Sequence, residues 1–293
     1  MQRKAITVNW IEQTIRDFLD DPASNSLGGD FKEKAWDHPI VGFSNGGDSL
    51  YQKLKEDIGQ FYWTPIELFQ RIFPDSKATA DELTVICWIL PQTEPTKSDN
   101  RKELVHVSER WARSRIFGEV INDNLRRHLV EKLREAGCEA VAPVVSPFWE
   151  RRTSEKYGFA STWSERHAAH VSGLGTFGLS DGLITPGGMA MRCGSVIAQI
   201  KIPPTERPYK DHHEYCLFYK EQICGRCIAR CPAGAITKKG HDKVKCQDHL
   251  HQKMNEYVKA NFGFEGYGCG LCQTKVPCES KIPTPSDLKQ EAP

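Results

Sequence analysis

The sequence lacks a long apolar run, and its positive and negative charges nearly cancel. Its longest strongly apolar stretch, LTVICWIL from Leu83 to Leu90, is less than half of a membrane span. A formal net charge of +1 gives no overall reason to expect nucleic acid or an anionic membrane surface, and leaves only local patches for either. The N-terminal segment has neither an apolar export region nor twin arginines. We therefore expect a soluble, cytoplasmic protein with no membrane partner.

The 293 residues also lack long repeats and low-complexity tracts. A chain of this length exceeds the usual size of one compact core, which favours a large domain plus a smaller one. The composition changes near residue 205, after which Cys, Gly and Pro interrupt the apolar pattern. We predict an α/β domain over residues 1–205 and a small domain over residues 206–293.

Apolar spacing near three and four residues predicts amphipathic helices at 8–20 and 49–61. Thr64, Pro65 and Glu67 stand at the N-cap, first and third positions of a helical segment, which is the pattern of a capping box. These signals place helices before the first strand.

Three strands are predicted, at 83–90, 138–145 and 195–202. A polar loop to about residue 100 follows the first strand. A helical pattern then covers 102–136, with an interruption near Phe117 and Gly118. Helices alternating with strands indicate an α/β layer with crossover connections.

Cysteine is abundant, with eleven residues, and clustered thiols in a reducing compartment indicate metal or redox chemistry. Eight lie from Cys216 onward. The segment ICGRCIARCPAGAIT, residues 223–237, spaces three of them as CxxCxxxCP. Two-cluster bacterial ferredoxins send the cysteine before the proline to the other cluster.

This crossing rule predicts two [4Fe–4S] clusters. The predicted ligands of the first are Cys216, Cys224, Cys227 and Cys278, and those of the second are Cys231, Cys246, Cys269 and Cys272. Two structural zinc sites are the alternative, since zinc also uses CxxC pairs. The CxxxCP element and the division into four plus four favour iron–sulfur.

The other three cysteines lie in or beside apolar segments. Cys87 and Cys138 are interpreted as packed core thiols. Cys193 is either a core residue or a neighbour of a cofactor.

A glycine-rich segment, SERHAAHVSGLGTFGLSDGLITPGGMAMR, precedes the third predicted strand. Its GLGTFG is formally a dinucleotide fingerprint, but it follows a helix rather than a strand and has no acidic residue at the expected distance. Plain loop architecture is one alternative. Close backbone approach to a bulky ligand is the other. Because a ferredoxin needs only about a quarter of this chain, the remainder is expected to receive electrons.

The glycine segment, CxxCxxxCP and GYGCGLCQTKVPC occur in an order that resembles the cobalamin-dependent epoxyqueuosine reductases and their relatives, the reductive dehalogenases. The resemblance extends from about residue 70 to 280. It implies a nitroreductase-like α/β domain that binds base-off cobalamin, followed by a two-cluster ferredoxin-like domain. It further implies that the glycine loop, namely Gly173, Leu174, Gly175 and Gly178, packs against the corrin.

The proton donor departs from the family pattern, because Ser146 stands where epoxyqueuosine reductases carry an Asp. Reductive dehalogenases use a tyrosine beside a basic residue, and Tyr157 after Lys156 is a candidate. A surface tyrosine is the alternative. His167 and His170, at helical i, i+3 spacing, are further candidates for proton donation or cofactor contact. A helix-surface or core role is the alternative for both.

The resemblance implies a reductase of an epoxide in tRNA or of an organohalide, with reduced ferredoxin or flavodoxin as its electron donor. Residues 201–260 carry 12 Lys and Arg against 7 Asp and Glu, a local excess that suits tRNA phosphates. Two alternatives remain open: an electron-transfer or corrinoid-reactivating protein, and an iron–sulfur protein whose large domain only docks partners. The sequence does not predict the oligomeric state.

Overall fold

A mixed α/β fold is built on one four-stranded sheet in the computed structural model, which describes residues 6–288. The strand order is β1-β2-β8-β3, and each neighbouring pair is antiparallel. The strands are β1 (Ile40–Asn45), β2 (Thr84–Pro91), β8 (Met191–Ala198) and β3 (Ala140–Val141).

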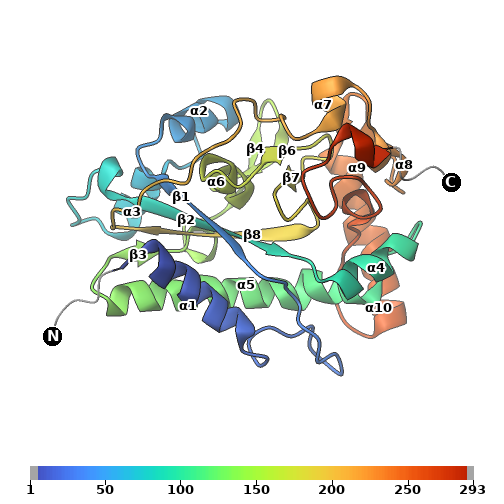
Figure 1. The fold of residues 1–293 in the computed structure, drawn as a ribbon, viewed down its shortest axis with the longest axis horizontal. Coiled ribbons are helices and arrows are strands. Elements are labelled where there is room, and N and C mark those ends of the chain that lie inside the picture. Colours follow the sequence, from blue (N-terminus) through green and yellow to red (C-terminus); the bar gives the residue numbers. More distant parts are fainter. Residues whose placement is uncertain (1–5, 289–293) are drawn as a thin grey trace.

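Helices cover both faces of this sheet (Figure 1). On one face lie α1 (Val8–Asp20) and α5 (Glu109–Glu135), and on the other α2 (Ser49–Ile58), α3 (Pro65–Ile72) and α6 (Glu165–Val171). Alternate side chains of the central strand β2 enter the two cores: Ile86, Trp88 and Leu90 on the α1/α5 side, Val85, Cys87 and Ile89 on the other. Because both faces are covered, β2 reads as a continuous apolar run.

The strongest sequence signals are confirmed. Helix α1 has the predicted bounds, and α2 ends three residues before the predicted end. The capping box forms at α3, where the backbone N–H of Thr64 donates to the Glu67 carboxylate at 2.9 Å.

The sheet topology differs from the prediction. Strand β1 was not predicted, because its six residues include a glycine and show no clear alternation; it pairs along its whole length with β2. The predicted strand at 138–145 is reduced to Ala140–Val141, followed by a 3₁₀ turn at Pro143–Val145. Proline cannot donate to a ladder, which ends the pairing there.

The prediction of a polar loop up to about residue 100 is wrong, because that segment forms helix α4 (Glu94–Lys102). Thr93 is its N-cap and Pro95 lies in its first turn. Its only buried side chains are the polar Thr96 and Asn100. A helix without an apolar face gives no periodic signal, so the pattern could not predict it.

The interruption predicted near Phe117 and Gly118 is also wrong, because α5 is continuous. Gly118 instead permits a close contact: a Cβ there would lie 2.6 Å from the indole of Trp36, whose Nε1 donates to the Gly118 carbonyl at 3.0 Å. Gly118 therefore allows α5 to pack closely against Trp36 and does not interrupt the helix.

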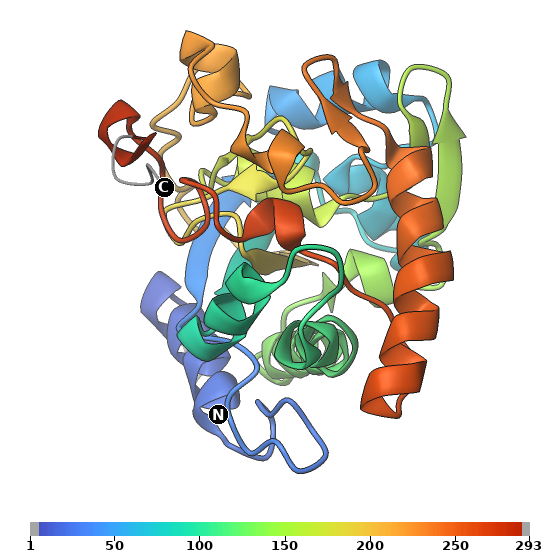
Figure 2. The same cartoon turned by 90° about the vertical axis from the view of Figure 1, so that its right-hand side faces the viewer.

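The C-terminal part lies against one end of the sheet and beside α4 and α5 (Figure 2). It consists of short elements: α7 (Leu217–Glu221), α8 (Arg226–Ala229), β9 (Ile236–Thr237), β10 (Gly240–His241), α9 (Lys243–Asp248), a π-helical turn (His249–Met254) and α10 (Asn255–Phe262). Two further hairpins precede it: β4 (Arg151–Ser154) with β5 (Gly158–Ser161), and β6 (Thr176–Phe177) with β7 (Leu183–Ile184). The division at residue 205 stays a prediction.

A buried arginine joins the layers. Arg126 of α5 is 1% exposed and binds Glu165 of α6, Glu119 and Asp123 of its own helix, and the Cys193 carbonyl of β8. Burial opposes the charge of Arg126, but these carboxylates raise its pKa above the ordinary value. The arginine is thus held charged inside the protein.

Replacing Glu165 by Gln should destabilise the fold by about 1–3 kcal/mol, because a buried charged partner of Arg126 is lost. Urea denaturation measures the difference. The matched control is Glu109→Gln, which removes a more exposed partner of Arg113 and should cost under about 1 kcal/mol. Equal effects of the two substitutions would contradict a structural role for the buried pair.

Candidate iron–sulfur centres and the adjoining cavity

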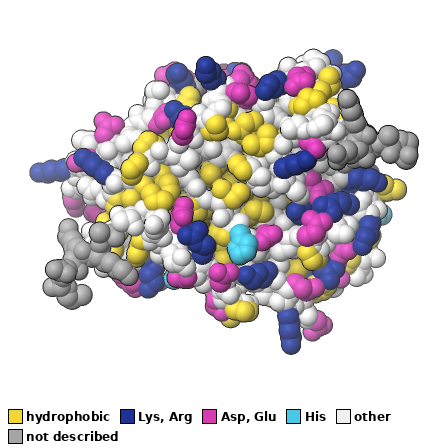
Figure 3. Space-filling view, in the orientation of Figure 1, with side chains coloured by type: hydrophobic (Ala, Val, Ile, Leu, Met, Phe, Trp, Pro, Cys, Tyr) yellow, Lys and Arg dark blue, Asp and Glu magenta, His cyan; other side chains and the backbone are white. Residues whose placement is uncertain are grey.

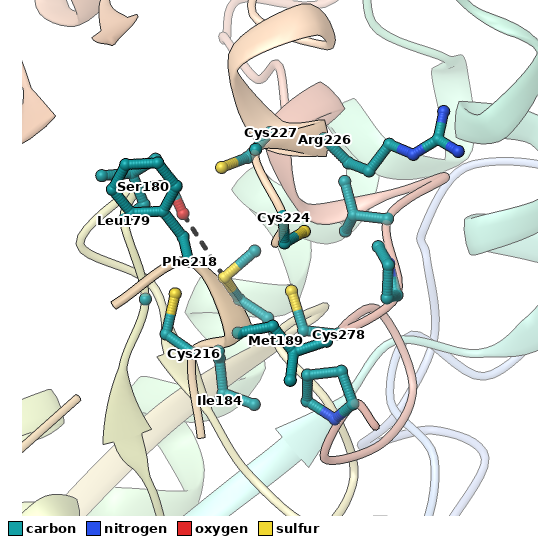
Figure 4. Close-up of a pocket in the computed structure, with 16 residues that line it drawn as sticks. Leu179, Ser180, Ile184, Met189, Cys216, Phe218, Cys224, Arg226, Cys227 and Cys278 are labelled. Atoms are coloured by element: carbon teal, nitrogen blue, oxygen red, sulfur yellow. Dashed lines mark hydrogen bonds between the residues drawn. The ribbon is translucent and has the colours of Figure 1, made fainter. Parts of the chain in front are cut away.

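Four cysteines that are distant in sequence surround one small cavity (Figure 4). They come from the start of α7, the loop before α8, α8 itself and the C-terminal loop, and they are Cys216, Cys224, Cys227 and Cys278. Apolar side chains complete the wall, among them Ile184, Met189 and Phe218. The structure therefore brings together the four thiols predicted to hold the first cluster.

The electrostatics of this group, the first thiol group, disfavour free thiolates. Burial raises the pKa of Cys278 well above its usual value, and the neighbouring Cys227, Cys216 and Cys224 raise it further. Burial, together with repulsion from Cys216 and Cys224, raises the pKa of Cys227 to about 12. A metal core supplies the positive charge that such a set of thiolates needs.

The other four predicted ligands, which we call the second thiol group, are Cys231, Cys246, Cys269 and Cys272. Burial raises the pKa of Cys269 to about 11, and repulsion from Cys246 and Cys231 adds to the effect of burial. Burial also raises the pKa of Cys272, and repulsion from Cys269, Cys246, Cys227 and Cys231 raises it further. The backbone N–H of Ala235 donates to Cys231 Sγ at 3.3 Å.

Two sets of four thiols fit two [4Fe–4S] clusters by the chemistry of their donors. The partition of the eight cysteines by the crossing rule, with Cys231 in the set of the later cysteines, stays a prediction. Within residues 6–288 no group of three or more His, Cys, Asp or Glu side chains is arranged to hold a single metal ion.

Helix α4 holds the second thiol group through Asn100. This side chain is fully buried, and its Nδ2 donates to the carbonyl of Cys269 at 3.1 Å and to Thr274 Oγ1 at 3.2 Å. Arg230, which precedes Cys231, donates in turn to the carbonyls of Asn100 and Glu103 at 3.2 and 2.7 Å. Both halves of the cysteine pattern are therefore attached to one helix.

The same helix holds the first thiol group through Glu279. The buried Glu279 carboxylate accepts hydrogen bonds from Arg101 Nε at 2.8 Å and from the Lys275 N–H at 2.6 Å. The Met189 N–H donates to the Cys278 carbonyl at 2.7 Å. A Cβ on Gly188 would lie 2.1 Å from the Glu279 carbonyl, so this approach requires glycine, which also has φ of +84° here.

The glycines of GYGCG have a packing role. Gly270 has φ of +65°, and a Cβ there would lie 1.9 Å from the indole of Trp111 on α5. A Cβ on Gly266 would lie 2.5 Å from the Ile116 side chain. The loop thus lies flat on α5 and brings Cys269 to the helix.

A second cavity, the junction cavity, lies between α5, β8 and this loop, and its volume is about 160 Å³. Its lining residues come from both parts of the chain and are Gln92, Trp111, Arg115, Met191, Arg192, Leu250, Tyr267, Gly268, Cys269, Gly270 and Gln273. Sequence reasoning missed Trp111, Arg115 and Arg192. They lie outside any motif, and no signal in the sequence distinguishes them.

A corrin does not fit the junction cavity as the structure shows it. Pockets that hold drug-sized ligands have volumes of roughly 300–1,000 Å³, and a corrin is larger than such a ligand. The glycine loop offers no alternative surface at its centre: a Cβ on Gly173 would lie 2.6 Å from the Glu206 carbonyl, and one on Gly175 would lie 2.2 Å from that of Ile184. Leu174 is buried beneath them, and Gly178 packs on Ile184.

The two histidine candidates make structural contacts. His170 is buried, with Nδ1 2.7 Å from the Gly175 carbonyl and its ring stacked on Tyr209. Burial lowers its pKa below the usual value. Burial, followed by the nearby Arg166, lowers the pKa of His167 to about 3, so this residue is neutral at pH 7. Neither histidine lines the junction cavity.

Tyr157 lies in the turn of the β4–β5 hairpin and is 40% exposed. Its hydroxyl and the Lys156 ammonium both bind Asp57. Burial and this carboxylate raise the pKa of Tyr157. Ser146 donates to the Pro143 carbonyl at 2.7 Å. Neither Tyr157 nor Ser146 lines either cavity, so a role for Tyr157 in proton donation stays a prediction.

Cys87 is buried in the core on the α6 side of the sheet, as interpreted from the sequence, and Cys193, for which a core position was one of two alternatives, is buried there too. Cys138, also interpreted as a core thiol, is only half-buried. Burial raises the pKa of the Cys193 thiol to about 12. Among the helices of residues 6–288, none has the length and apolar character needed to cross a membrane.

Comparison with known proteins supports the fold. No protein-family model and no curated protein matches the chain. A variant of the catabolic reductive dehalogenase NpRdhA matches with a TM-score of 0.51 and 12% identity, over 96% of this chain and 38% of that one. The chain shares its fold with this dehalogenase. It spans well under half the dehalogenase's length.

Two epoxyqueuosine reductases give weaker matches. The enzyme from Bacillus subtilis matches with a TM-score of 0.45 and 19% identity, over 94% of this chain and 70% of that one. An epoxyqueuosine reductase solved with a modified tRNA stem loop matches with a TM-score of 0.44 and 18% identity, over 94% and 67% of the two chains. The dehalogenase match confirms, as a similarity of fold, the resemblance to reductive dehalogenases that the sequence indicates. Identities this low establish the fold alone.

Replacing Asn100 by Ala should cost about 1–3 kcal/mol, since the substitution removes the buried donor to Cys269 and the acceptor of the Ser108 N–H. It should also speed the loss of iron from the second thiol group. Thermal unfolding and iron release to a chelator measure these effects. Asn124→Ala, at an exposed position of α5, is the control, and equal iron release from both variants would contradict the role of Asn100.

Proposed function

We propose that this protein is an iron–sulfur reductase that holds two [4Fe–4S] clusters and passes electrons to an acceptor in the junction cavity. One observation carries the proposal: four of the predicted cluster ligands line one small cavity, and Cys269, a predicted ligand of the second cluster, lines the junction cavity. Electrons that reach the second cluster would then leave it beside a cavity. This arrangement suits a one-electron relay to a bound molecule.

The reaction class is a reduction. The named activities of the similar structures, epoxyqueuosine reduction and reductive dehalogenation, are both reductions of an organic molecule. We extend that broad class to this chain, with the substrate left to experiment. The size of the junction cavity favours an acceptor smaller than a corrin, so the chemistry is proposed without cobalamin.

A tRNA substrate is the less favoured form of the proposal. Residues 201–260 carry the local basic excess, but the face drawn in Figure 3 has Lys and Arg interspersed with Asp and Glu. Tight binding to phosphates needs several cations on one surface. Turnover of epoxyqueuosine-containing tRNA tests this form directly.

Anaerobic reconstitution followed by metal analysis is the deciding experiment. We expect about eight iron atoms per chain and no stoichiometric cobalt after purification with cobalamin present. Zinc in place of iron would contradict the reductase. Cobalt bound one to one would restore the corrinoid form of the proposal and require the junction cavity to open.

Paired substitutions test which cysteines share a cluster. Cys231→Ser should abolish the EPR signal of the cluster held by Cys246, Cys269 and Cys272, although Cys231 lies in sequence beside the other set. Cys278→Ser should abolish the signal of the first cluster. Each variant should retain about four iron atoms, and Cys138→Ser, outside both sets, should retain about eight.

The same EPR spectra would also show whether Cys231 instead binds the first cluster. Loss of the Cys224 and Cys227 cluster signal on Cys231→Ser would exclude the crossing. An unchanged signal in both cysteine variants would exclude cluster ligation altogether.

A further inference from the structure

The wall of the junction cavity contains two arginines. Arg115 projects from α5 and Arg192 from β8, and both line the cavity. They share one carboxylate, Glu119, which lies 3.4 Å from Arg192 Nε and 3.9 Å from Arg115. Glu119 also binds Arg126 at 3.2 Å. One carboxylate thus serves three arginines, and within residues 6–288 Arg126 alone of the three has further acidic partners, Asp123 and Glu165.

The guanidinium of Arg115 is fixed at the cavity wall. Nη2 of Arg115 donates to the Tyr267 hydroxyl at 3.1 Å, and Cζ of Arg115 lies 5.0 Å from the centre of the Tyr267 ring. Burial, followed by repulsion from Arg192, lowers the pKa of Arg115 to about 10. Arg115 and Arg192 repel each other in this wall, and an anion bound beside both would offset that repulsion.

The other walls of the cavity are apolar or neutral. Trp111, Met191 and Leu250 supply apolar surface, and Gln92 and Gln273 supply amides. At roughly 10–15 Å³ for each water-sized group, a volume of about 160 Å³ admits about ten heavy atoms. A ligand that suits this lining is compact, with an apolar body and one anionic end.

The cavity is separate from the space between the thiols. Of the second thiol group only Cys269 lines it, and none of the first group does. A molecule in the cavity would therefore lie beside the second cluster without displacing a ligand of either cluster.

We infer that the junction cavity binds a small organic carboxylate, with its carboxylate between Arg115 and Arg192 and its apolar body against Trp111 and Met191. Arginine presents paired donors that match a carboxylate, which favours this anion over a spherical one. The inference rests on the proposed function only in giving the bound molecule a role as electron acceptor.

Titration calorimetry of the reconstituted protein tests the inference, with cyclohexanecarboxylate as the probe and cyclohexanecarboxamide as its neutral counterpart. The wild-type protein should bind the acid and not the amide. Arg192→Gln and Arg115→Gln should each weaken binding of the acid by at least about tenfold, as expected for loss of a charge-assisted hydrogen bond. Arg192→Lys should recover part of the loss.

Arg127→Gln is the matched control, because Arg127 lies on the exposed face of α5, the helix that carries Arg115. It should bind the acid as the wild type does. Circular dichroism and iron content should be unchanged in the Arg192 variants, which separates binding from folding. Equal binding of acid and amide, no binding of the acid, or an equal effect of Arg127→Gln would overturn the inference.

The test also separates this inference from the proposed function. Binding of the acid by a protein that assembles no cluster would overturn the reductase and leave the carboxylate site standing. Two assembled clusters with no binding of the acid would do the reverse.

Discussion

The attachment of the cysteine loops to helix α4 is the constraint on which both thiol groups depend. Two adjacent residues of this helix make the connection: Asn100 binds the backbone at Cys269, and Arg101 binds Glu279 next to Cys278. Buried polar groups are costly unless they are paired, so these contacts tolerate few alternative arrangements. One turn of helix therefore fixes where both cysteine loops lie relative to the sheet.

Glycine determines how closely the loops approach the scaffold. Gly188 allows the turn before β8 to meet the backbone at Glu279, and Gly270 allows the loop to meet Trp111. A methyl group at either position would overlap atoms of its neighbour. The glycine-rich character of both segments thus reflects contact between two parts of the chain, whereas the sequence alone left a bulky ligand as an equal explanation.

Sequence patterns predicted the elements whose side chains are sorted by hydrophobicity. Helix α1 buries Ile11, Ile15 and Leu19 on one face, and β2 is apolar throughout, so both gave clear signals. Helix α4 faces inward with Thr96 and Asn100, and its stability comes from specific hydrogen bonds that periodicity does not record. The cysteines were found because metal ligation demands one residue type at restricted spacing.

The arginines of the junction cavity had no comparable signal, since Arg115 and Arg192 are 77 positions apart and only the antiparallel sheet beside α5 brings them together. Their position has an electrostatic consequence for the second thiol group. A reduced cluster carries more negative charge than an oxidised one, so nearby cations favour reduction, and an anion bound between them would weaken that effect. A carboxylate in the cavity would thus make the reduced cluster a stronger reductant at the moment when an acceptor is present.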